Sequence, residues 1–160
     1  MDERARVLEY LRAHRVMTIA TVGENGPAAA ATFYANRGLD LYFLSAPHSR
    51  HCRNMEADPR VAVTIHEDYA EWSAIKGIQM TATGRELKGA ELAAAQQLYA
   101  AKFPDASDSE AASGAIARAL SRMSWYELAA VQVRFIDNSR GFGHRTEWSR
   151  AQFLATARPE

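Results

Sequence analysis

Residues 39–65 constrain most strongly what this chain can fold into, because a short polar segment there separates two apolar runs. The runs, residues 39–44 and 61–65, have the length and the β-branched or aromatic content of buried strands. Between them, Pro59 ends a short helical segment, since proline cannot continue a helix. We therefore expect two strands joined through a short helix.

The polar segment brings hydroxyl and cationic side chains together at the expected helix start: Ser45, Ser49, Arg50 and His51. Free backbone N–H groups and the helix dipole favour an anion at such a start. Arginine adds a planar fork that matches phosphate oxygens. The segment fits a phosphate-bearing cofactor held between two antiparallel strands, but a helix cap with solvated cations would use the same residues.

The overall composition narrows the class of protein. At 160 residues, one domain over residues 1–150 with a C-terminal tail over 151–160 is expected. Lys plus Arg equals Asp plus Glu at 19 each, which argues against nucleic acid or an anionic membrane as partner. Cys52 is the only cysteine, so no intrachain disulfide can form. With no signal-peptide pattern and no run long enough to span a bilayer, we expect a cytoplasmic protein.

Hydrophobic periodicity predicts the remaining elements. Asp2 can cap a helix ending near His14, and Asn25-Gly26 predicts a hairpin whose loop Pro27 makes longer than two residues. Expected strands cover 16–22, 28–36, 39–45, 60–65, 75–87 and 124–136. Expected helices cover 89–102 and 109–123. Residues 66–73, 105–109 and 137–149 are expected to be irregular.

The short links between these strands imply antiparallel pairing. Neither a G-x-G-x-x-G motif after a strand nor a P-loop is present. The sequence therefore predicts a mainly β fold, a closed or nearly closed antiparallel barrel with peripheral helices. Four alanines in residues 28–31 either pack tightly under the first helix or leave room for a flat ring.

Few side chains suggest a metal-binding or catalytic role. His48, His51 and Cys52 lack the further ligands that a zinc site needs, so no metal is expected, and Cys52 fits a small core residue. Gln79 is a polar residue in an apolar strand. Its amide either forms a cross-strand hydrogen bond or hydrogen-bonds the edge of a bound heterocycle. No catalytic acid, base or nucleophile can be assigned, a shortage that suits a protein whose chemistry occurs on a cofactor.

Residues 16–86 resemble the pyridoxamine 5′-phosphate oxidase-like FMN-binding split-barrel superfamily. The resemblance lies in LDLYFLS-x-x-x-SRH followed by DPRVAVTI and GIQMTATGRE. The ending FIDNSRGFGHRTEW is similar to a small uncharacterised bacterial branch of that superfamily. The resemblance implies a split β-barrel and a homodimer with FMN at the interface. The FMN contacts it implies are Thr32, Phe33, Tyr34, Leu44, Ser45, Ser49, Arg50, His51, Gln79 from either subunit, and Trp125.

Two departures from the family pattern remove positive charge. Ala29 and Tyr34 stand where the oxidase has Arg and Lys on its second strand, and His51 stands where Lys is usual. The oxidase's C-terminal substrate-binding arginine pattern is also missing. Oxidation of pyridoxamine phosphate is therefore not predicted.

The resemblance implies an FMN-dependent oxidoreductase that acts on a small molecule, with hydride chemistry at flavin N5 and NAD(P)H as a possible electron donor. Two alternatives stay open. One is a non-catalytic flavin- or haem-binding split barrel, with candidate axial ligands His48, His51, His66 and His144. The other is a deazaflavin-dependent reductase, which shares the barrel.

Overall fold

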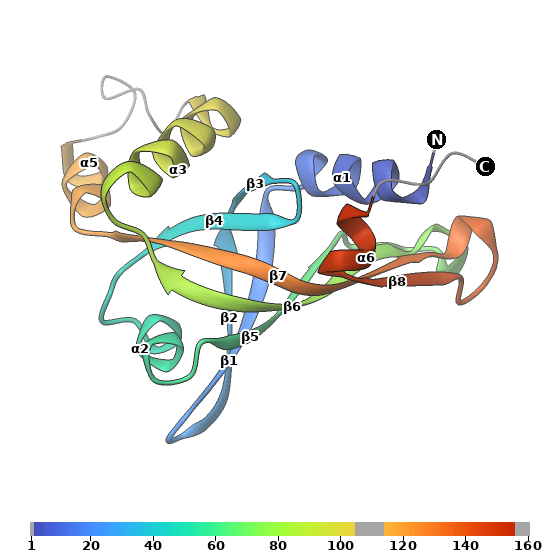
Figure 1. Cartoon of the computed structure of the whole chain (residues 1–160), viewed down its shortest axis with the longest axis horizontal. Coiled ribbons are helices and arrows are strands. Elements are labelled where there is room, and N and C mark those ends of the chain that lie inside the picture. Colours follow the sequence, from blue (N-terminus) through green and yellow to red (C-terminus); the bar gives the residue numbers. More distant parts are fainter. Residues whose placement is uncertain (1, 105–113, 156–160) are drawn as a thin grey trace.

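The centre of the fold is an antiparallel eight-stranded sheet that curls into a half-barrel (Figure 1). The computed structural model describes residues 2–104 and 114–155. The strand order is β2-β1-β5-β6-β7-β4-β3, with β8 paired to β7. The strands are β1 (Val16–Gly23), β2 (Gly26–Phe33), β3 (Ala35–Arg37), β4 (Asp40–Ser45), β5 (Arg60–His66), β6 (Lys76–Glu86), β7 (Ser124–Asp137) and β8 (Arg145–Ser149). The antiparallel barrel with peripheral helices expected from the sequence is confirmed.

Helices lie around the sheet rather than between its strands (Figure 1). They are α1 (Glu3–Ala13), α2 (Arg50–Ala57), α3 (Gly89–Lys102), α5 (Gly114–Ser121) and α6 (Arg150–Leu154), with short 3-10 turns η1 (Trp72–Ala74) and η2 (Asn138–Arg140). Within the described ranges, none of these helices is long and apolar enough to span a membrane. The linker expected at 105–109 lies outside the described residues, as does the start of the helix expected at 109–123.

At Tyr34 the chain passes from β2 at one end of the strand order to β3 at the other end. The strand expected over residues 28–36 is in fact two strands, because the chain bends at Tyr34 and changes partner from β1 to β4. The Tyr34 side chain is fully buried, and its hydroxyl donates to the Leu11 carbonyl of α1 at 2.8 Å. Its backbone N–H donates to the Arg15 carbonyl at 2.9 Å. This buried corner lets β2 and β3, at opposite ends of the order, follow each other in sequence.

The core fills the inside of the curled sheet. Along β6, Ile78, Met80 and Ala82 point inward, whereas Gln79 and Thr81 point outward, as the alternation in the sequence predicted. The opposite surface of β1, β5, β6 and β7, called the outer face below, is not covered by a helix of the described chain.

Three local expectations were wrong. The β1–β2 loop is only Glu24-Asn25, because Gly23 pairs with Gly26 and Pro27 fits on an edge strand that needs no second partner. Asp2 holds the N-cap position of α1 without a side-chain capping bond. The segment 137–149 is not irregular throughout, since its last five residues form β8.

The chain after β8 continues into α6. Phe153 of α6 is buried and stacks edge-to-face on Trp148, with ring centroids 5.6 Å apart. The domain boundary expected at residue 150 stays a prediction.

Candidate functional site

The end of β4 and the start of α2 bring together three of the expected anchor residues. Ser49 is the N-cap of α2, and its hydroxyl accepts from the Cys52 backbone N–H at 3.4 Å. The His51 imidazole lies between two hydroxyls, with Nε2 2.7 Å from Ser45 Oγ and 3.3 Å from Ser49 Oγ. Hydroxyls, an imidazole and the free N–H groups of a helix start form a donor set suited to a phosphate.

Arg50 extends this anchor toward the β1–β2 hairpin. Its side chain is exposed, and Nη2 donates to the Asn25 carbonyl at 3.0 Å. A crevice of about 440 Å³ lies between α2 and the hairpin, and Arg53 and Asn54 also line it. Arg50 thus directs its guanidinium to the hairpin side of α2.

Cys52 faces inward from α2 and belongs to the main core. Burial raises the pKa of its thiol, but hydrogen bonds with His51, Ser49 and Tyr126 outweigh burial and leave that pKa below its ordinary value. Among the described residues, no group of three His, Cys, Asp or Glu side chains is placed to hold a metal ion.

Aromatic side chains connect the expected ring-lining residues of β2 and β7. Phe33 lies 5.4 Å from Phe103, Phe103 lies 4.6 Å from Tyr99, and Tyr99 packs edge-to-face on Trp125 at 5.2 Å, all between ring centroids. Trp125 is directly opposite Leu44 of β4. Thr32 is half-buried next to Phe33. The sequence interpretation missed Tyr99 and Phe103, because Tyr99 lies on α3 and Phe103 directly follows it, far from β2 in the chain.

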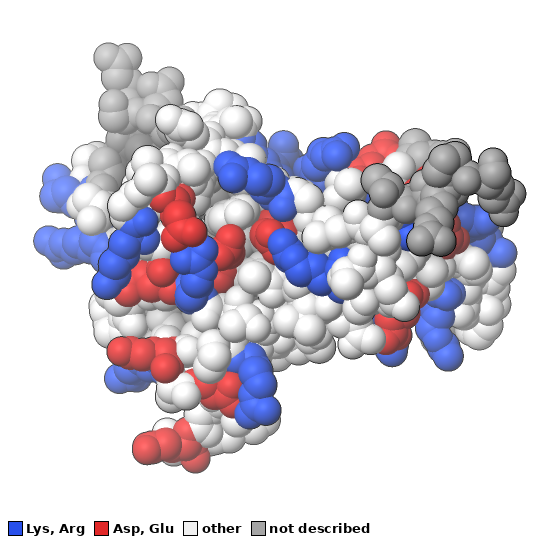
Figure 2. All heavy atoms as spheres, viewed as in Figure 1, with Lys and Arg blue, Asp and Glu red and all other residues white. Residues whose placement is uncertain are grey.

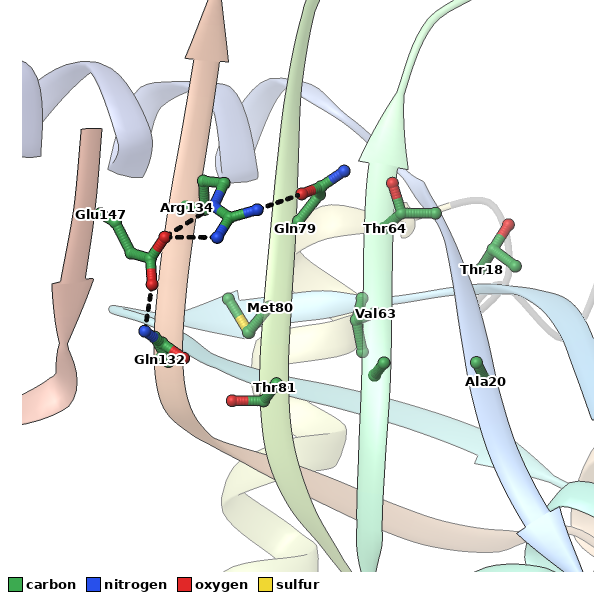
Figure 3. Close-up of a pocket in the computed structure, with 11 residues that line it drawn as sticks. Thr18, Ala20, Val63, Thr64, Gln79, Met80, Thr81, Gln132, Arg134 and Glu147 are labelled. Carbon is green, nitrogen blue, oxygen red and sulfur yellow. Dashed lines mark hydrogen bonds and ion pairs between the residues drawn. The ribbon is translucent and has the colours of Figure 1, made fainter. Parts of the chain in front are cut away.

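The outer face carries a shallow pocket of about 380 Å³ (Figure 3). Strand register aligns one row of its side chains across five strands: Thr18, Thr64, Gln79, Arg134 and Glu147. The next row includes Ala20, Ala62, Thr81 and Gln132. The pocket thus has a floor of small side chains and one polar end.

The polar end of this pocket is a connected network. Arg134 donates through Nε to Glu147 Oε2 at 2.6 Å and through Nη1 to Gln79 Oε1 at 3.4 Å. Gln132 also donates to Glu147. Alternation along β7 could have placed Gln132 and Arg134 on one face, but Glu147 was hidden because β8 was not expected.

One chain does not bring Gln79 to the anchor. Asn54 of α2 donates to Thr21 at 3.0 Å, so α2 lies on the side of β1 that carries Thr21. Gln79 shares the outer face with Thr18 and Ala20 on the other side of the same strand. The structure therefore joins Ser45, Ser49 and His51 in one cluster, directs the Arg50 side chain to the neighbouring hairpin, and leaves Gln79 on the opposite surface.

The histidines considered as haem ligands differ in their surroundings. His48 is exposed and makes no side-chain hydrogen bond within the described chain. His66 is exposed beside Glu67, and His144 contacts Glu3 of α1 at 2.9 Å. Glu3 also pairs with Arg140 at 2.8 Å, which ties the 137–149 segment to its own α1.

Charges of both signs lie close together on the face shown in Figure 2. Arg85 pairs with Glu91 at 2.7 Å and with Glu127 at 2.6 Å, and Arg150 donates to Asp40 at 2.8 Å. These contacts match the equal numbers of acidic and basic residues in the sequence.

A family model described as pyridoxamine 5′-phosphate oxidase matches residues 4–137. This chain belongs to that family. A UPF0306 protein of Klebsiella pneumoniae is 30% identical over 152 residues, covering 94% of this chain and 95% of its own length. These matches confirm the family resemblance inferred from the sequence, including its bacterial branch.

Solved structures share the fold at low identity. A heme binding protein from Mycobacterium smegmatis superimposes with a TM-score of 0.70 at 23% identity, over 91% of this chain and 58% of that one. A FAD-binding protein from Mesorhizobium loti gives 0.63 at 18% identity, over 83% and 90%. This chain thus shares the split-barrel fold with proteins whose names include both a flavin binder and a haem binder.

Proposed function

We propose that this protein is a cytoplasmic FMN-dependent oxidoreductase that works as a homodimer on a small-molecule substrate, with NAD(P)H as electron donor. The observation that carries the proposal is the donor set at the start of α2, where Ser45, Ser49 and His51 form one cluster and the first helical residue, Arg50, adds a guanidinium that contacts the hairpin. Hydroxyls, helix N–H groups and a guanidinium are complementary to a phosphate monoester.

When bound, FMN supplies hydride transfer at its flavin ring. The chain's own contribution is then binding and orientation. Arg50 and Ser49 would hold the phosphate, while Thr32, Phe33 and Leu44 would line the ring. Because His51 contacts both Ser45 and Ser49, it keeps those hydroxyls in place.

A second copy would cover the outer face. Val22 and Val131 are 57% and 53% exposed there, and between them lies a depression of about 410 Å³ lined largely by apolar and threonine side chains. A patch of this kind, depleted in charge at its centre, is typical of a protein interface. Gln79 and the anchor lie on opposite faces of a single chain, so in the proposed dimer Gln79 contacts the ring of the FMN that is held by the anchor of its partner.

The test is FMN binding to the purified protein, followed by absorption and by fluorescence quenching. We expect a flavin spectrum that bleaches on reduction, and by light scattering a particle of twice the 17.7 kDa chain mass. Arg50→Ala should weaken FMN binding about ten- to a hundredfold, since it removes one charge-assisted contact. Arg53→Ala is the matched control, because Arg53 lines the same crevice but is not assigned to the phosphate.

Equal affinity of Arg50→Ala and wild type would remove the anchor assignment, and a colourless protein that ignores FMN would refute the proposal. Haem binding is the second candidate, favoured by the likeness to the M. smegmatis heme binding protein and by His48, which is exposed and has no side-chain hydrogen-bond partner among the described residues. It predicts a sharp Soret band on adding haem. The deazaflavin alternative predicts tighter binding of a deazaflavin than of FMN in the same titration.

A further inference from the structure

We propose that Arg134 and Glu147 form a positioning pair that fixes the side-chain amide of Gln79, with its N–H donors facing the part of the outer-face pocket where a ligand ring edge would lie. This inference rests on the proposed function, in which Gln79 contacts the flavin ring. It adds two residues whose role comes from the contacts of this chain and not from any family motif.

The orientation of the Gln79 amide follows from the chemistry of arginine. A guanidinium carries only donors, so the Gln79 atom that faces Arg134 Nη1 at 3.4 Å must be the carbonyl oxygen. The amide nitrogen therefore points the other way, and Figure 3 shows it on the side of Thr64. Gln79 thus presents two N–H donors to the pocket.

Glu147 in turn fixes Arg134. Its Oε2 accepts from Arg134 Nε at 2.6 Å and lies 2.6 Å from Nη2, and Gln132 donates to its other oxygen. The guanidinium is thereby held by two of its nitrogens, which leaves Nη1 aimed at Gln79. The Arg134 and Glu147 side chains are 43% and 38% exposed, and an ion pair this exposed adds little stability by itself.

The groups beyond Gln79 in the same row have unused hydrogen-bonding capacity. Within the described residues, the hydroxyls of Thr18 and Thr64 make no hydrogen bond, although both line the pocket. A hydroxyl can donate or accept, whereas the fixed Gln79 amide can only donate at this side. The row therefore suits a heterocycle edge with a ring carbonyl or an unprotonated ring nitrogen opposite Gln79.

The experiment is a double-mutant cycle on Gln79→Ala and Arg134→Met, with FMN affinity and the absorption spectrum of bound FMN as readouts. Arg134→Met should weaken FMN binding about three- to tenfold, because an unfixed amide must be ordered on binding. It should also shift the bound flavin spectrum. In the Gln79→Ala background, Arg134→Met should change neither readout, since Arg134 acts through Gln79.

Arg85→Met is the matched control, because Arg85 lies on the same strand as Gln79 and also pairs with glutamates. It should leave the flavin spectrum unchanged. A second measurement needs no ligand: ¹⁵N relaxation of the Gln79 side-chain amide should show a rigid group in wild type and a mobile one in Arg134→Met and Glu147→Ala.

The outcomes separate this inference from the proposed function. Wild-type protein that ignores FMN refutes the function, while the relaxation measurement still decides whether the pair fixes Gln79. Wild-type protein that binds FMN, with an Arg134→Met effect that persists without Gln79, shows a merely structural ion pair and overturns the inference. An equally mobile Gln79 amide in wild type and variants overturns it as well.

Discussion

Gly84 on β6 faces α2, so replacing it by alanine should disturb the helix that starts at the proposed phosphate anchor. A methyl group at this position would lie 2.6 Å from Met55 Sδ and 3.2 Å from Leu128 Cδ2. Both neighbours are buried core side chains. Favourable contacts between heavy atoms lie at about 3.5–4.0 Å, so Met55 must move by about 1 Å. We expect Gly84→Ala to lower the free energy of unfolding by about 1–3 kcal/mol.

The cause can be isolated by also shortening Met55. Met55→Ala alone should cost about 2–5 kcal/mol, because it leaves a cavity in the core. In that background the new methyl at residue 84 has room, and alanine restricts the unfolded chain more than glycine does. Gly84→Ala should then be neutral or stabilising by up to about 1 kcal/mol. The coupling energy between the two substitutions should therefore be about 1–3 kcal/mol.

Urea unfolding at one fixed protein concentration, followed by far-ultraviolet circular dichroism, measures all four proteins. Thr83→Ala is the control, since Thr83 is the neighbouring exposed residue on the outer side of β6. Effects that add to within about 0.5 kcal/mol would show that Met55 is not what meets the new methyl, and would refute the packing argument.

Two further predictions concern one half-buried and one buried polar side chain, Lys102 and Asn138. The Lys102 ammonium donates to the Leu11 carbonyl at 3.1 Å, and burial lowers its pKa to about 8 from 10.5. Because the unfolded chain then binds more protons between pH 8 and 10.5, wild-type stability relative to Lys102→Met should rise by about 1–2 kcal/mol over that window, after discounting for partial exposure. A difference that stays flat in urea titrations at pH 7 and pH 10 would contradict this. The Asn138 amide donates to the Trp72 carbonyl at 2.8 Å and accepts from the Gly143 N–H at 3.0 Å. Asn138→Ala should therefore speed hydrogen exchange at Gly143 about tenfold or more, and unchanged protection would show that the loops are held in another way.

Elements with strong periodicity could be predicted from the sequence because their burial is set locally. The alternation in β6 and the boundaries of α3 follow from residues that are neighbours in the chain. The break at Tyr34 could not be predicted in this way. The break depends on α1, because the Leu11 carbonyl accepts a hydrogen bond from the Tyr34 hydroxyl. The residue pattern over 28–36 does not predict that contact. β8 was missed for a similar reason, since only five residues alternate there after two glycines.

The residues of the candidate site also differ in how far the sequence could predict them. The anchor is a contiguous segment, so Ser49 could be expected at a helix start, and the structure places it at the N-cap of α2. The row from Thr18 to Glu147 combines residues up to 129 positions apart, and only the register of five strands aligns them. The sequence identified Gln79 as an unusual amide and allowed Arg134 to be placed on one face of its strand, but it did not show that Arg134 and Glu147 lie beside Gln79.

The two-residue period of a strand explains why the proposed site needs two chains. Thr18 and Thr21 are three positions apart on β1, so their side chains point to opposite faces. Thr21 accepts from Asn54 of the anchor helix, and Thr18 lines the outer-face pocket with Gln79. The sheet itself therefore separates the proposed phosphate anchor from the residue proposed to contact the ring. Bending the sheet cannot join them, because curvature keeps inner and outer faces distinct. The proposed homodimer joins them only if the anchor of one chain meets the outer face of its partner, so that both parts contact one cofactor.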